Sequence, residues 1–159
     1  MNRPRCLLLI SLTLLLIGCQ TPTPMHASFN EADYTPFAGV GTGRIEGQAF
    51  ATTRGGLVIK AAGREVHAVP KTTYSEEIIQ RLFVGNDPPT STDPASKKFT
   101  RRTMADADGR FEFSNLPPGE YYVTCRIVWE YSSGNETGGN AYTLVTVQNG
   151  QTTKALVTR

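Results

Sequence analysis

The sequence predicts a mainly β protein, folded as an antiparallel β-sandwich with one short helix. Short runs of alternating apolar and polar residues recur along the chain, and glycine, proline and asparagine separate them at regular intervals. One segment instead repeats its apolar residues at helical spacing. Many short strands with regular turns are typical of a sandwich. We expect this sandwich to follow a cleaved secretion signal and a flexible tether, in which Tyr34 and Phe37 are candidates for docking on the domain.

The beginning of the chain has the composition of a secretion signal. Arg3 and Arg5 precede an apolar run over residues 7–17. This run would make a helix of about 16 Å, whereas a bilayer core needs roughly 20 apolar residues. A basic start, a short apolar middle and a small-residue exit together indicate a signal that directs secretion and is then removed.

The exit of this signal reads Leu-Ile-Gly18-Cys19, which resembles the lipobox of bacterial lipoproteins. The resemblance implies cleavage between Gly18 and Cys19 and lipid attachment, with acyl chains such as palmitate, on Cys19. Two or more acyl chains hold a protein stably to a bilayer. Gln20 follows the cysteine in place of aspartate, and by resemblance this favours the outer membrane over the inner membrane. The expected location is therefore the bacterial envelope, on the periplasmic or the outer side.

Three parts are expected along the chain: a lipoprotein signal peptide at 1–18, a lipidated tether at 19–42 and one folded domain at 43–159. The formal net charge of +2 disappears with the two signal arginines, which gives no support for nucleic-acid binding or a polybasic membrane patch. Only Cys125 then remains as a free thiol, so no internal disulfide can form. We expect Cys125 to pack in the core.

The strands and the helix can be placed by their patterns. The helix is expected at about 74–83, with capping-box spacing from Thr73 to Glu76, and an exposed loop at 85–96. The last two strands are expected to form a hairpin at Asn149-Gly150. The longest strand should direct Tyr121, Val123, Cys125, Ile127 and Trp129 to one face. Strands are expected over residues 44–50, 57–60, 64–70, 110–113, 121–130, 141–147 and 153–158.

Three sequence blocks resemble the carboxypeptidase regulatory-like family. They are Gly43-Arg-Ile-Glu-Gly47, then Asp106-Ala-Asp-Gly-Arg-Phe-Glu-Phe113, then Leu116-Pro-Pro-Gly-Glu-Tyr-Tyr-Val123. The resemblance covers roughly 43–158 and implies a transthyretin-like (prealbumin-like) sandwich that serves as a non-enzymatic accessory module. The insertion at 71–103 is longer than in the simplest members. The matching residues are turn and core residues, so they explain folding rather than binding.

No catalytic, metal or cofactor site is predicted. Asp106 to Gly109 is better explained as a turn than as a calcium loop, because no downstream glutamate completes the ligand set. His67 is the only histidine of the folded part, without cysteine partners at zinc spacing. No Gly-x-Ser-x-Gly elbow accompanies it. The protein is therefore expected not to be an enzyme.

The candidate binding surface comprises Trp129, Tyr131 and Tyr142, which flank a glycine-rich tip. The alternative for Trp129, which the sequence favours, is that it continues the core face of its strand. Aromatic side chains at a loop edge can stack on sugars or anchor a protein partner. The favoured hypothesis is a membrane-anchored module that contacts an unidentified envelope protein or has a structural role. The alternatives are a glycan-binding module and an assembly lipoprotein of a secretion machine.

Overall fold

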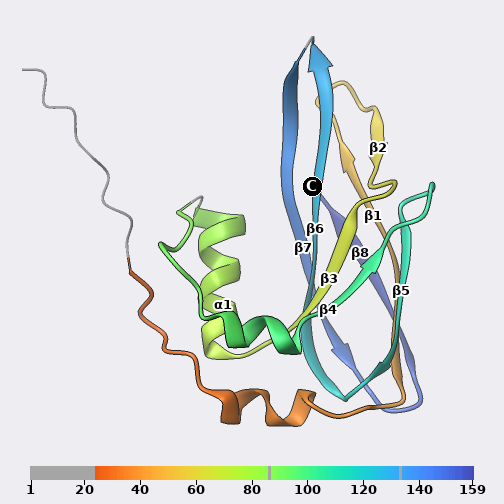
Figure 1. Cartoon of the computed structure of the whole chain (residues 1–159). Coiled ribbons are helices and arrows are strands. Elements are labelled where there is room, and N and C mark those ends of the chain that lie inside the picture. The colour runs from red at the N-terminus through yellow and green to blue at the C-terminus, as the bar shows by residue number, and fades with distance from the viewer. Residues whose placement is uncertain (1–23, 86, 133) are drawn as a thin grey trace, which may run out of the picture.

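The computed structural model describes residues 24–85, 87–132 and 134–159, so Gly18 and Cys19 lie outside the described residues. Two four-stranded sheets face each other, which confirms the β-sandwich (Figure 1). The first sheet contains β1 (Gly43–Thr52), β2 (Val58–Lys60), β5 (Arg110–Leu116) and β8 (Thr152–Thr158). The second has the order β4 (Arg101–Met104), β3 (Glu65–Pro70), β6 (Gly119–Ser132) and β7 (Asn135–Val147).

Every strand pair is antiparallel except β1 with β8, which is parallel from Arg44 opposite Thr152 to Phe50 opposite Thr158. The predicted hairpin at Asn149-Gly150 is therefore wrong. The two residues do form a turn, with Gly150 at a φ of 71°, but the turn carries the chain from β7 in one sheet to β8 in the other.

The core lies between the two sheets and follows the alternation seen in the sequence. Ile45 and Leu116 are fully buried from the first sheet, and Val123 meets them from the second. Cys125 is 3% exposed, which confirms its predicted place in the core. Burial raises the pKa of its thiol to about 11, so the side chain is a neutral, apolar packing group.

The predicted turn at Asp106 to Gly109 is confirmed. Gly109 has a φ of 74°, which favours glycine. One carboxylate oxygen of Asp106 accepts hydrogen bonds from the backbone N–H groups of Asp108 and Arg110, both at 2.8 Å. The Asp108 carboxylate is bonded by Lys60 and Arg110, and this lowers its pKa. These carboxylates support the turn.

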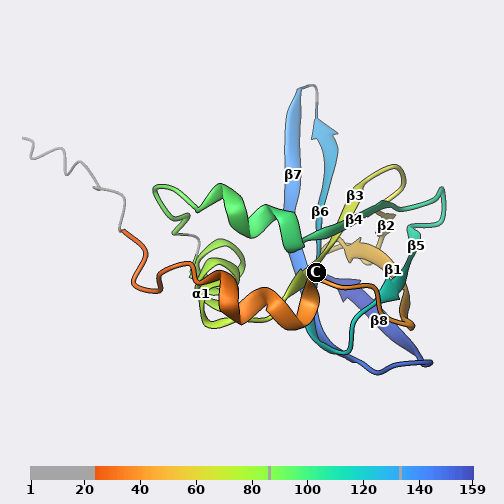
Figure 2. The same ribbon diagram turned by 60° about the horizontal axis from the view of Figure 1, so that its bottom comes forward.

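A third layer of short helices covers the outer face of the second sheet (Figure 2). It contains η1 (Glu31–Phe37), α1 (Thr73–Ile79), η2 (Gln80–Gly85) and η3 (Pro94–Phe99), of which only α1 is α-helical. The predicted helix is thus present, and it continues as a π-helical turn. Its cap lies one residue earlier than expected, because Thr72 and Ser75 bond each other's backbone N–H groups. The expected loop ends in η3.

This layer buries residues that alternation alone would leave in solvent. Tyr122 and Thr124 point away from the sandwich core, yet they are only 3% and 6% exposed. Tyr34 of the predicted tether is 1% exposed, and its ring stacks on Phe99 with centroids 4.8 Å apart. The ring of Phe37 packs edge-on against Tyr121 in the main core. The later part of the segment predicted as a tether is therefore docked on the domain.

The segment before η1 runs along the helical layer, and we call residues 24–30 the strap. The Glu77 carboxylate accepts hydrogen bonds from the backbone N–H groups of His26, at 3.0 Å, and Ala27, at 2.6 Å. These two bonds lower the pKa of Glu77 to about 2, with smaller contributions from the His26 ring and the Arg81 guanidinium. The carboxylate side chain is only 16% exposed, so an internal ion and the strap backbone satisfy each other.

The strap should therefore respond to acid. Because the pKa of Glu77 lies below its usual 4.5, ionised Glu77 favours the docked strap above about pH 4.5. This contribution is lost as the pH falls through about 2. The amide resonance of Ala27, followed by NMR from pH 6 to about pH 1, should titrate with a midpoint near the lowered pKa of about 2, and the Glu77→Gln variant should not show this titration. A midpoint near pH 4.5 in the protein without substitutions would show that Glu77 does not bind the backbone of the strap.

Candidate functional site: a cleft on the outer sheet face

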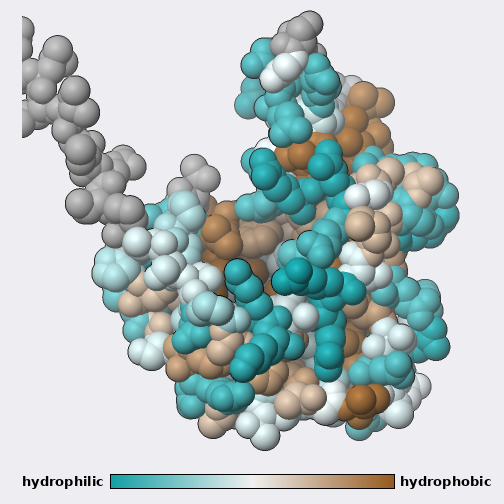
Figure 3. All heavy atoms as spheres, viewed as in Figure 1, coloured by the Kyte–Doolittle hydropathy of each residue, from teal (hydrophilic) through white to brown (hydrophobic). Residues whose placement is uncertain are grey.

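A cleft lies where the helical layer stops short of covering the second sheet. Strands β6 and β7 extend beyond the helices and beyond the rest of the sandwich (Figure 1). The surface at the base of the hollow between these strands and the helical layer is apolar, and polar surface borders it (Figure 3). We call this region the outer-face cleft. It is built by the outward side chains of β3, β6 and β7 together with η2.

Three neighbouring hollows make up the cleft, and Phe83 of η2 lines all of them. The middle one, of about 360 Å³, is mainly polar in its residue types and has a floor formed by His67 and Thr124. A deeper one of about 280 Å³ extends under η2 and η3 and is lined by apolar residues such as Ile78 and Leu82. The third, of about 600 Å³, follows the edge of β7 from Gly138 to Tyr142 and reaches Arg159. Cofactor-sized and sugar-sized ligands bind in spaces of this order.

Aromatic rings hold the centre of the cleft in place. Phe83 packs edge-on against Tyr142, with centroids 5.4 Å apart. Tyr142 in turn packs against Tyr122, at 6.1 Å. Tyr122 donates a hydrogen bond to Glu76 of α1, which ties the sheet to the helical layer. Phe83 and Tyr142 remain only half-buried, so parts of both rings are available to a ligand.

The middle hollow contains a histidine beside a carboxylate. His67 Nε2 lies 2.8 Å from a carboxylate oxygen of Glu65. The same nitrogen has no partner in hydrogen-bond alignment. Interaction with His67, and to a smaller extent with Arg102, lowers the pKa of Glu65. Glu65 is therefore an acceptor and not a proton donor at neutral pH, whereas a glycosidase acid needs a raised pKa.

The upper part of the cleft presents hydrogen-bonding groups in a row. Arg126 of β6 lies opposite Asn140 of β7, and both line the middle hollow with Glu136. A guanidinium offers donors only, a carboxylate offers acceptors only, and an amide offers both. Next to an aromatic ring, this set can bind a ligand with several hydroxyl groups and an apolar face.

A larger hollow of about 880 Å³ lies over the first sheet, but its groups are already engaged. Lys154 Nζ lies 2.6 Å from Glu46, and the cation of Arg44 pairs with Glu112. Its one aromatic ring, Phe111, belongs to the core and is 5% exposed. We therefore place the candidate site in the outer-face cleft.

Two of the three aromatic residues predicted as a surface, Trp129 and Tyr142, lie on opposite faces of the second sheet. Tyr142 lies in the cleft, on the outer face of the second sheet. Trp129 is on the opposite face, where it packs partly buried against the core and contacts the position of Gly138. Tyr131 lies in β6, and its side chain is outside the described part. The physical reason is strand parity, because β6 and β7 pair with Trp129 opposite Thr137 and Thr124 opposite Tyr142.

Phe83, His67 and Asn140 were missed as site residues. Phe83 lies outside the apolar helical period over Tyr74, Ile78 and Leu82. An aromatic residue outside the packed face of a helix is a candidate for a surface site, and this was the sequence signal for Phe83. In residues 24–85, 87–132 and 134–159, no three metal-ligating side chains cluster. Among the same residues, no helix is long and apolar enough to cross a membrane.

The fold and the cleft define a β-sandwich module with a helical layer over one sheet. A solved protein of Pseudomonas aeruginosa, PA1324, named a "putative carbohydrate binding protein", shares 31% sequence identity with this chain. The match covers 84% of this chain and 99% of that one, with a TM-score of 0.73. The chain belongs to the family of this Pseudomonas protein.

Other comparisons add little. GBS52, the minor pilin of Streptococcus agalactiae, matches 75% of this chain and 44% of its own length at 20% identity, with a TM-score of 0.40. This likeness is too weak to support an argument about function. No family model matches the chain, so the resemblance to the carboxypeptidase regulatory-like family stays a prediction. No curated protein matches it either.

Proposed function

We propose that the protein is a non-enzymatic, carbohydrate-binding module, and that the outer-face cleft is its binding site. The observation that supports this most is the placement of Phe83 between three hollows, beside a row of hydrogen-bonding groups. A relative that aligns over nearly its whole length and is named a carbohydrate binding protein points in the same direction. These two observations make glycan binding preferable to the hypothesis of a protein partner.

A glycan array tests the proposal. The full protein should bind a limited set of glycans, and an excess of the same free sugar should compete for that binding. Titration calorimetry should then give a stoichiometry of one sugar per chain. If no glycan on an array that includes bacterial envelope polysaccharides is bound, the proposal is wrong. Release of a shortened glycan during the measurement would contradict the non-enzymatic part.

We also propose that the module is held to the bacterial envelope by lipid on Cys19, in the outer membrane. The apolar run of 7–17 and the Gly18-Cys19 junction support this proposal. Mass spectrometry of the native protein should find a chain that begins at Cys19 and carries acyl groups. An unmodified cysteine at this position would refute the anchor, without affecting the glycan proposal.

A further inference from the structure

The strap is fixed to the helical layer at two points. Its first point is Glu77, whose carboxylate binds the backbone of His26 and Ala27. Arg81, four residues further along, lies 2.8 Å from the same carboxylate and donates a hydrogen bond to the carbonyl of Pro24 at 2.7 Å. The Arg81 side chain is only 10% exposed. A largely buried carboxylate thus accepts from N–H groups of the strap backbone, and a largely buried guanidinium donates to one of its carbonyl groups.

The second point is an aromatic contact at the other end of the strap. The ring of Phe29 packs against Tyr34, at 5.3 Å, and edge-on against Tyr74 of α1, at 5.7 Å. Tyr34 and Tyr74 are both buried. The strap is therefore held by charge at its beginning and by packing at its end, and it leads directly into η1.

Docking of the strap shortens the free chain between the domain and Cys19. An extended residue spans at most ~3.6 Å, so the five steps from Cys19 to Pro24 reach at most ~18 Å. Were the strap free and η1 still docked, the twelve steps from Cys19 to Glu31 would reach ~43 Å. The first case restricts which face can meet a membrane, whereas the second allows many more orientations.

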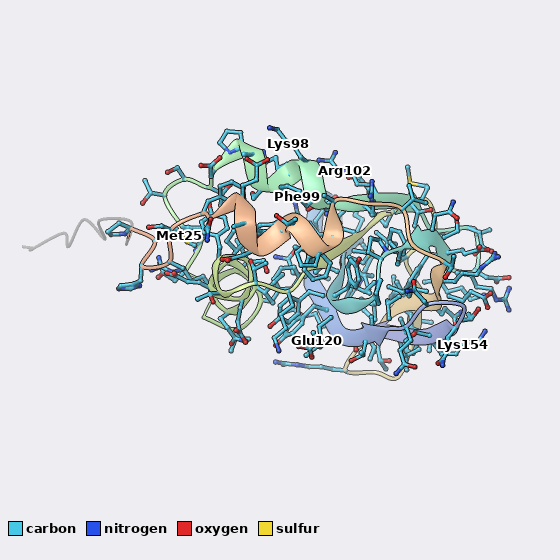
Figure 4. The ribbon with its side chains drawn as sticks, turned by 90° about the horizontal axis from the view of Figure 1, so that it is seen from below. Met25, Lys98, Phe99, Arg102, Glu120 and Lys154 are labelled. Atoms are coloured by element: carbon cyan, nitrogen blue, oxygen red, sulfur yellow. The ribbon has the colours of Figure 1, made fainter. Side chains whose placement is uncertain are left out.

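We propose that the strap is a clamp that turns the helical layer toward the bilayer, so that this end of the domain rests on phospholipid head groups. The inference depends on the proposed lipidation of Cys19. Met25 of the strap and Lys154 of β8 lie at opposite ends of the molecule (Figure 4). On the strap's side, η3 exposes Lys97 and Lys98, while the neighbouring η1 exposes the carboxylates of Glu31 and Asp33, so charge alone does not select this face. The short reach of the chain between the docked strap and Cys19 favours the orientation.

Energy transfer in liposomes tests this orientation. The full lipidated protein is placed in liposomes of phosphatidylglycerol and phosphatidylethanolamine that carry an acceptor dye at the head groups. A donor dye is attached either through Lys98→Cys or through Lys154→Cys, while the buried Cys125 stays unlabelled. We expect transfer from position 98 to be at least threefold more efficient than from position 154.

The clamp itself is tested by Glu77→Ala, with Glu76→Ala as the matched control from the same helix. Glu76 bonds Tyr122 and not the strap. Loss of Glu77 should remove most of the difference between the two labels, and loss of Glu76 should keep it. In the lipidated protein without substitutions, bound to liposomes, the Ala27 amide should also exchange slowly with solvent deuterium. This measurement does not depend on the stability of a variant.

The outcomes separate the clamp from the anchor. Protein that fails to float with the liposomes refutes both lipidation and the clamp. Floating protein with equal transfer from both labels, or with rapid exchange at Ala27, refutes the clamp and leaves the anchor intact. Equal effects of Glu77→Ala and Glu76→Ala also refute the clamp.

Discussion

Replacing Phe113 with alanine should cost about 3–5 kcal/mol of folding free energy and lower the melting temperature by about 10–20 °C. Phe113 is 5% exposed and packs against Phe111, with ring centroids 6.0 Å apart. The deletion leaves a cavity between two sheets that cannot collapse without breaking strand pairs. Since the free energy of unfolding of a whole domain is only about 5–15 kcal/mol, this one change should remove a large share of it. Urea unfolding followed by circular dichroism measures it.

Leu156→Ala is the matched control for this experiment. Leu156 also lies in the first sheet, but it points outward and is 54% exposed. Its removal should change the free energy of unfolding by no more than about 0.5 kcal/mol. Similar losses in the two variants would contradict the position of the core between the two sheets.

The core could be predicted from the sequence because its signal is local. Alternation along β6 assigned Val123 and Cys125 to the interior, and a strand has only two faces. The pairing of β8 could not be read in this way. Ala155 and Val157 point to the core whether β8 pairs with β7 or with β1, so the same alternation fits both arrangements. The Asn149-Gly150 signal then favoured the local hairpin, although the chain crosses to the other sheet.

The third layer and the cleft depend on contacts far apart in sequence. Thr124 looked solvent-exposed because alternation describes one sheet and ignores what folds over its other face. Trp129 and Tyr142 looked like neighbours because they flank one tip, but only the register of β6 with β7 shows that they lie on opposite faces. Glu77 binds backbone N–H groups of the strap. Because nearly every residue type has a backbone N–H group, the strap sequence does not show that these groups bind a carboxylate. The core residues were therefore predictable, whereas of the cleft residues only Tyr142 was named from the sequence.

Phe83→Ala should weaken glycan binding at least tenfold, which corresponds to about 1.4 kcal/mol. Phe83 is the one ring shared by all three hollows, so its removal takes away the apolar surface on which a sugar face would stack. Because the ring is only half-buried and lies outside the sandwich core, the fold should persist. Titration calorimetry with the glycan that binds best on the array measures the change, and circular dichroism verifies the fold.

Trp129→Ala is the informative comparison, because Trp129 belonged to the candidate surface predicted from the sequence, whereas the structure packs it against the core. Its ring lies on the inner face of the second sheet, away from the cleft, so affinity should stay within about twofold although some stability is lost. The two variants should therefore have opposite effects. Phe83→Ala should reduce binding and leave folding nearly unchanged, whereas Trp129→Ala should lower stability and leave binding nearly unchanged. If Trp129→Ala abolished binding and Phe83→Ala did not, the sugar would have to bind near the hairpin tip, and the outer-face cleft would be the wrong site.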